Sequence, residues 1–239
     1  MAKSWDNWKG AGIRWHEPGK PDIYLLGDRS EYWKQDDPTD PSKIVIAQHQ
    51  LMDEVYAIVQ DQTLQPNSIA LFRSGIQHED ETLRSNHVIW TRVFSHYFEE
   101  LKPLLLELVS HHKAKVRLSI IQGLDPLPPE PETTNILSAG LIDKSKKVRS
   151  FTVQQIRQND QKQVLPNLSN LLEKEQDPDL SNELKTVISI LTKGYFVEPD
   201  PYDPLMCTVH HGTKYERFDM SIAEAASENI QERLNALTK

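Results

Sequence analysis

The sequence repeats a pattern every 32 residues, and this period constrains the fold more than any other feature. Aligning Val116, Val148 and Leu180 brings further residues into register. The other columns are Leu104, Ile136 and Leu168; Ile120, Thr152 and Leu184; and Leu124, Ile156 and Ile188. Such a period is typical of helix pairs that bury their apolar stripes only by stacking on one another. The pattern therefore predicts stacked helix pairs over residues 41–196.

The apolar periodicity and the breaker residues place the individual helices. Asp40 can cap a first helix in which Pro41 is tolerated in the opening turn. Leu83-Arg84 corresponds to Val116-Arg117, one residue out of step, which indicates a degenerate leading repeat. Prolines in the segment 125–131 favour an extended linker. Helices are expected over residues 41–60, 68–75, 81–98, 101–110, 115–124, 133–141, 147–158, 163–173 and 179–191.

The two ends of the chain differ from the repeats. Residues 1–40 are irregular, and we expect their aromatic side chains to pack as a cap on the first helices; within them, residues 22–27 form a short strand or an extended clamp. Residues 197–204 contain too many prolines for a helix, and residues 205–220 predict a loop or a short hairpin. A last helix from Ser221 closes the far end of one compact domain, 197–239 being its final segment. The N-terminal aromatics are Trp5, Trp8, Trp15, Tyr24, Tyr32 and Trp33.

Composition narrows the function classes. The 239 residues carry a net charge of −8, which disfavours nucleic acid, since affinity for phosphates needs gathered cations. A basic protein partner suits this charge better. No apolar run approaches the roughly 20 residues that cross a bilayer, and the start MAKSWDNWKG lacks a secretory signal, so a cytoplasmic location is expected. The single cysteine, Cys207, fits a reducing compartment.

Few residues point to chemistry. Cys207, His210 and His211 are of the types that bind metals, but a zinc site needs three or four ligands and no second cluster follows at a suitable spacing. Cys207 and His210 could also form a nucleophile and base, although the pattern is unspecific. The sequence therefore predicts no catalytic residue, no metal site and no cofactor.

One segment resembles a known family. Residues 136–149, ILSAGLIDKSKKVR, are similar to a HEAT repeat, in which a turn with an aspartate leads into Val-Arg at the start of the second helix. The resemblance implies an all-α fold, a short right-handed α-solenoid of the armadillo-like type. Asp143 can cap the following helix and Arg149 can reach the capping carboxylate of an adjacent unit, so both are expected to be structural. His111 stands where the aspartate is expected, which predicts a weaker turn.

Because no catalytic residue is predicted, the function must be inferred from the residues on the surface. In solenoids of helix pairs the second helices line the inner curve, and their outward positions here are polar and able to form hydrogen bonds. This predicts a non-catalytic protein-binding module, an adaptor or an inhibitor such as a bacterial toxin-immunity protein. The expected inner-face residues are Asn86, His87, Arg117, Ser119, Gln122, Gln154, Gln155, Arg157, Ser181, Asn182 and Lys185.

Two alternatives follow from the same resemblance. A HEAT-like DNA glycosylase acts on damaged bases and needs a cationic groove with a carboxylate and aromatic side chains, for which Trp90 and Arg92 are candidates. A HEAT-like bilin lyase acts on a chromophore-carrying protein, and no residue separates it from a plain binder.

Overall fold

The computed structural model describes residues 13–25, 43–124, 131–203, 205–211 and 214–219. The chain divides into two compact units, residues 1–127 and 128–239, and this boundary falls within the expected repeat region 41–196. Both units are mainly helical, as expected. Each also contains a small antiparallel sheet, so the all-α expectation needs correction, and the expected solenoid stays a prediction.

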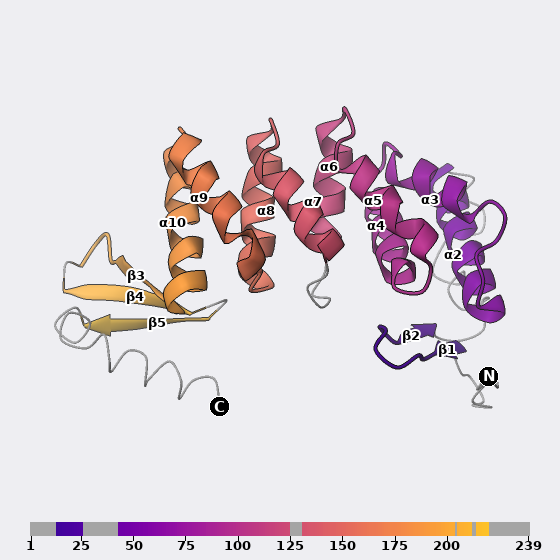
Figure 1. Ribbon diagram of the computed structural model, residues 1–239, viewed down its shortest axis with the longest axis horizontal. Coiled ribbons are helices and arrows are strands. Elements are labelled where there is room, and N and C mark those ends of the chain that lie inside the picture. Colours follow the sequence, from indigo (N-terminus) through magenta and orange to yellow (C-terminus); the bar gives the residue numbers. More distant parts are fainter. Residues whose placement is uncertain (1–12, 26–42, 125–130, 204, 212–213, 220–239) are drawn as a thin grey trace. The chain divides into compact units, whose positions relative to one another are not determined.

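Unit 1 consists of a β-hairpin followed by helices. Helix α3 packs against α4, and α4 packs against α6 (Figure 1). Helix α4 begins after Asp80, whose carboxylate accepts a hydrogen bond from the backbone N–H of Leu83, and it ends earlier than expected. The elements are β1 (Ile13–Trp15), β2 (Ile23–Leu25), α2 (Lys43–Asp61), α3 (Ser68–Ile76), α4 (Glu81–Ser95), η1 (Glu99–Leu101), α5 (Lys102–Leu108) and α6 (Ala114–Gln122).

The hairpin of unit 1 covers the end of α4. Trp15 is buried, and its ring centroid lies 4.0 Å from that of Tyr97, just after α4. The Tyr97 hydroxyl donates to the carbonyl of Pro21, and burial raises the pKa of Tyr97 to about 12. Trp15 therefore packs as expected of a cap, whereas Tyr24 is exposed. Trp5, Trp8, Tyr32 and Trp33 lie outside the described residues.

Unit 2 contains two further helix pairs and a three-stranded sheet. Helix α7 packs against α8, α9 packs against α10, and α8 lies beside α10 (Figure 1). Gly194, with φ of 86°, ends α10 in the left-handed conformation that favours glycine. The elements are α7 (Pro131–Leu141), α8 (Lys146–Gln158), η2 (Lys162–Val164), α9 (Leu165–Lys174), α10 (Pro178–Lys193), β3 (Phe196–Pro199), β4 (Met206–His211) and β5 (Lys214–Asp219).

The sheet of unit 2 extends the hairpin expected over residues 205–220. Strands β4 and β5 pair in antiparallel register, with His210 opposite Tyr215, and β3 adds to the other edge of β4, with Val197 opposite Val209. Cys207 and Val209 are buried on one face of β4. The helix expected from Ser221 lies outside the described residues.

The aligned columns of the repeat are almost entirely buried. The members of the first three columns and two members of the fourth, Leu124 and Ile156, lie in the core of their own unit. Ile188 is the exception and is half-buried. Val187 and Ile190 are buried instead and form the apolar face of α10 at this point. The period therefore identified the packing positions correctly within each unit. No described helix is long and apolar enough to cross a membrane.

Candidate functional site

The same side-chain contact closes the turn inside each helix pair. In all four turns a side chain accepts a hydrogen bond from the backbone N–H two residues later. The acceptors are Nδ1 of His78 (3.0 Å), Nδ1 of His111 (3.2 Å), Oδ1 of Asp143 (2.7 Å) and Oε1 of Glu175 (3.2 Å). His111 thus supplies an acceptor where an aspartate was expected, through a longer contact than that of Asp143, and the expectation of a weaker turn stays a prediction.

An arginine near the start of the second helix binds the same turn. Nη1 of Arg84 donates to the carbonyls of residues 78 and 79, and Nη1 of Arg117 donates to those of residues 111 and 112. Arg149 donates to the carbonyl of Asp143 at 2.9 Å. In the last pair Ser181 occupies this position. Arg117 is only 4% exposed, so its expected place on a binding face is wrong.

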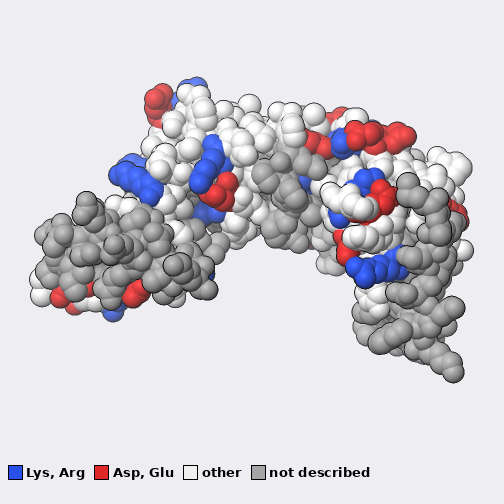
Figure 2. Space-filling view, turned by 60° about the horizontal axis from the view of Figure 1, so that its bottom comes forward, with Lys and Arg blue, Asp and Glu red and all other residues white. Residues whose placement is uncertain are grey.

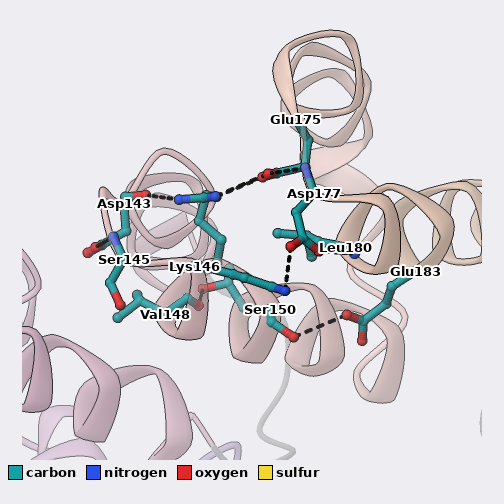
Figure 3. A network of polar contacts seen from close by, with 11 residues as sticks. Asp143, Ser145, Lys146, Val148, Ser150, Glu175, Asp177, Leu180 and Glu183 are labelled. Atoms are coloured by element: carbon teal, nitrogen blue, oxygen red, sulfur yellow. Dashed lines mark hydrogen bonds and ion pairs between the residues drawn. The ribbon is translucent and has the colours of Figure 1, made fainter.

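Further contacts join neighbouring helix pairs within each unit. In unit 2, Arg149 donates through Nε and Nη2 to Glu175, at 2.9 and 3.2 Å, and Lys146 lies 2.6 Å from Asp177 (Figure 3). Arg149 thus reaches a carboxylate of the adjacent pair as expected, although Asp177 is the one that caps α10. Arg149 holds the pKa of Glu175 below its usual range. In unit 1, Nε of Arg84 donates to Ser119 at 3.1 Å.

Acidification is expected to weaken the turn at His111. Its pKa is lowered by burial and by nearby positive charges, so the unfolded chain binds the proton more readily and stability falls as pH drops below about 6.5. We expect the Tm to fall between pH 7.5 and 5.5, and His111→Asp to reduce that fall, because aspartate keeps the acceptor without titrating in this range. Thermal unfolding at both pH values checks this.

His112→Gln provides the comparison, since it removes the neighbouring exposed imidazole and leaves the turn hydrogen bond of His111 in place. An equal fall in Tm for the wild-type protein and His111→Asp would contradict the role of the His111 imidazole.

Two other expected inner-face residues of unit 1 also lie inside the protein. His87 is 3% exposed; its Nδ1 lies 2.8 Å from the carbonyl of Leu83, and its ring meets Phe72 edge-on. Burial lowers the pKa of His87. Ser119 is buried as well. The expectation that His87 and Ser119 face outward is therefore wrong, while Asn86 and Gln122 are half-buried.

In unit 2 the expected residues do form a polar surface. We define the α8/α10 face as Ser150, Gln154 and Arg157 of α8 together with Asn182, Glu183 and Lys185 of α10. All six are exposed or half-buried, and hydrogen bonds from Ser150 (3.1 Å) and Gln154 to the Glu183 carboxylate join the two helices (Figure 3). Gln155 is half-buried and accepts a hydrogen bond from Asn159 instead. Ser181 is half-buried at the start of α10.

The sheet meets one end of this face. Nη2 of Arg157 lies 3.4 Å from Nδ1 of His210 on β4, and Nε2 of His210 lies 2.8 Å from Glu198 on β3. Since the guanidinium can only donate, Nδ1 of His210 is the acceptor and Nε2 donates to Glu198. The imidazole thus connects α8 to the sheet and fixes the Arg157 side chain.

Glu183 was not expected from the sequence. It is half-buried, and burial raises its pKa, although hydrogen bonds from Ser150 and Gln154 and the charge of Arg157 act in the opposite direction. The sequence could have indicated Glu183 only through its position. It comes one residue before the buried column residue Leu184 and 33 residues after Ser150, to which it is hydrogen-bonded.

Replacing Glu183 with glutamine is expected to raise the Tm at pH 7 by a few degrees. A carboxyl with a raised pKa stabilises the fold below its unfolded pKa and loses that contribution as pH rises through its folded pKa, so at pH 7 the charge opposes folding. Glutamine keeps the shape and can accept the same hydrogen bonds. Calorimetry at pH 7 and pH 4 measures the effect; a gain of equal size at both values would contradict this explanation.

The residues considered for a metal or nucleophile site are not brought together. Cys207 and His210 are three residues apart on β4, so their side chains project from opposite faces of the sheet. Burial raises the pKa of the Cys207 thiol. The idea of a Cys207–His210 pair is therefore wrong. Among the described residues there is no group of three His, Cys, Asp or Glu side chains that could hold a metal ion.

The candidate glycosylase residues are placed unsuitably for a groove. Arg92 is 2% exposed and lies in the core, and Trp90 stacks on Phe94 with centroids 5.5 Å apart. On the face shown in Figure 2, the described Lys and Arg residues of each unit form small separate patches, several of them beside Asp or Glu residues.

An open groove lies along α7 and α9 of unit 2. It has a volume of about 870 Å³ and includes Ile142, Asn167, Asn170 and Leu171. The Arg149–Glu175 pair also lines it. Ile142, which is 82% exposed, adds an apolar side chain to a lining that is otherwise largely polar.

Comparison with known proteins adds no assignment. No family model matches the chain, and no curated protein or solved structure shows significant similarity to it.

Proposed function

We propose that the chain is a non-catalytic protein-binding module that recognises another protein through the α8/α10 face. The helix pairs are proposed to be HEAT-like repeats, for which the common turn contact and the buried 32-residue columns are the support. An adaptor or an inhibitor, including a toxin-immunity protein, uses such a surface.

The observation that carries this proposal is a polar surface held in place before binding. Ser150 and Gln154 are fixed by hydrogen bonds to Glu183, and Arg157 is fixed by His210. Side chains already held in one arrangement lose less entropy when a partner binds. Asn182 and Lys185 are exposed beside them and supply further donors and an acceptor.

The test uses a triple variant of exposed residues, Gln154→Ala, Asn182→Ala and Lys185→Ala, as bait in a lysate of the source cells. A control double variant, Asn167→Ala and Asn170→Ala, changes the groove along α7 and α9 instead. We expect one protein that the wild type and the control retain and the triple variant loses. Retention of the same proteins by all three baits would contradict the proposal.

Duplex DNA is the second probe, because the glycosylase alternative predicts tight binding that weakens steeply with salt. Such binding would contradict a protein-only partner. We expect weak binding, given the net charge of −8.

A further inference from the structure

We propose that protonation of His210 breaks its contact with Arg157, so that binding of the partner protein at the α8/α10 face weakens in acid. This inference rests on the proposed function, because it names the regulation of that same face.

The contact between Arg157 and His210 requires a neutral imidazole. Nη2 of Arg157 lies 3.4 Å from Nδ1 of His210. A guanidinium has no acceptor and keeps its charge, so Nδ1 must have its lone pair available to receive the hydrogen bond. Protonation places a hydrogen on Nδ1, and two donors of like charge then face each other. The hydrogen bond is lost, and the two cations repel each other.

Glu198 holds the ring in either charge state. Its carboxylate lies 2.8 Å from Nε2 of His210, accepts a hydrogen bond from the neutral ring, and forms an ion pair with the protonated one. The imidazole therefore keeps its contact with β3 when it is protonated, and the contact with α8 is the one that breaks. The His210 side chain is 18% exposed, so water can reach it. Histidine is the side chain that ordinarily changes charge between about pH 5 and 8.

Among the charged or titratable groups near the ring, Arg157 is the one whose contact depends on a neutral imidazole. Arg217 is paired with Asp200, and the Tyr215 ring centroid lies 6.3 Å from that of His210. His211 projects from the other face of the sheet. The groups near the ring are Arg157 of α8, Glu183 of α10, which feels the charge of Arg157, Glu198 of β3, and Tyr215 and Arg217 of β5.

Loss of this contact changes the α8/α10 face in two ways. Ser150 and Gln154 stay bonded to Glu183, but Arg157 loses one of its constraints, so more of its freedom must be given up when a partner binds. The imidazolium also adds a positive charge beside the face, which opposes a basic partner. Both effects weaken binding in acid.

The first test follows the full chain by NMR between pH 7.5 and 5.5, without a partner. We expect Nδ1 of His210 to be unprotonated at pH 7.5 and to gain its proton over this range, with a matching shift of the Arg157 Nε–H signal. His210→Gln keeps a donor and an acceptor without titrating, so it is expected to abolish that shift. His211→Gln, on the other face, and Glu183→Gln, which removes the nearby carboxylate, are expected to keep it.

The second test measures binding. Proteins from the source-cell lysate are captured on the immobilised full chain at pH 7.5 and then washed at pH 5.5. We expect the protein that the triple variant loses to be released about tenfold more from the wild type than from His210→Gln.

The inference would be overturned by a protonated Nδ1 at pH 7.5, by an Arg157 shift that persists in His210→Gln or vanishes in Glu183→Gln, or by equal release from the two baits. These results leave the proposed function standing, because the NMR results concern the chain without a partner and the release still requires a partner bound at pH 7.5. The proposed function fails instead if the triple variant retains the same proteins at pH 7.5.

Discussion

Replacing Gly75 with alanine is expected to destabilise unit 1 by about 2–3 kcal/mol. A Cβ at this position would lie 2.0 Å from Cδ2 of the His87 ring, far inside contact distance. The ring cannot move easily, because Nδ1 is bonded to the carbonyl of Leu83 and the ring is enclosed against Phe72. Helix α3 must therefore shift away from α4. Urea unfolding, followed by circular dichroism, measures the loss.

Two variants make this result specific. Ser74→Ala changes the neighbouring exposed residue of the same helix and is expected to cost little. Adding His87→Ala to Gly75→Ala is expected to recover part of the lost stability, because the clash is removed even though a cavity remains. Full stability of Gly75→Ala alone would show that α3 and α4 do not approach each other as described.

Replacing Arg149 with methionine is expected to cost about 3 kcal/mol. The Glu175 carboxylate is 5% exposed and would lose two of its donors, and the turn carbonyl of Asp143 would lose another. Because Arg149 lowers the pKa of Glu175, the pair stabilises the protein above the unfolded pKa of that carboxyl and loses its effect as pH falls through the folded pKa. The cost should therefore shrink in acid, which unfolding at pH 7 and pH 3 measures.

The control is Lys146→Met, which removes the more exposed contact to Asp177 in the same network and is expected to cost less than about 1 kcal/mol. Arg149→Met combined with Glu175→Gln should recover much of the loss, since no buried charge is left unpaired. An equal cost for the Lys146 and Arg149 variants would contradict the structural role assigned to Arg149.

The positions of the core residues were largely predictable because they depend on a period. Stacked helix pairs must place apolar side chains at equivalent points, so Leu104, Ile136 and Leu168 are all buried. Ile188 was mispredicted because a helix has 3.6 residues per turn, so the buried face of α10 passes through Val187 and Ile190 at this point. Of the sheet in unit 2, only the hairpin of β4 and β5 was predicted. The alternation in β4 indicates a hairpin, but it does not reveal that β3 pairs with the other edge of β4.

The candidate site was predicted in part. Polarity placed Gln154, Arg157, Asn182 and Lys185 on the surface of unit 2, and the structure agrees. The same rule failed for His87 and Arg117, because polar side chains can be buried when backbone carbonyls accept their hydrogen bonds. Residue type did not show that His111 can take the place of the aspartate, because its Nδ1 accepts the same turn hydrogen bond that the carboxylate of Asp143 accepts.

Site-specific photo-crosslinking tests the central claim most directly. A photoreactive amino acid replaces Gln154 on the α8/α10 face or, in the control, Asn170 at the groove along α7 and α9. Irradiation in the source cells is expected to join the Gln154 variant to one protein, with a basic segment at the crosslinked peptide, and to give no such product from the Asn170 variant. The same product from both positions, or none from Gln154 in cells that express the chain normally, would contradict recognition through the α8/α10 face.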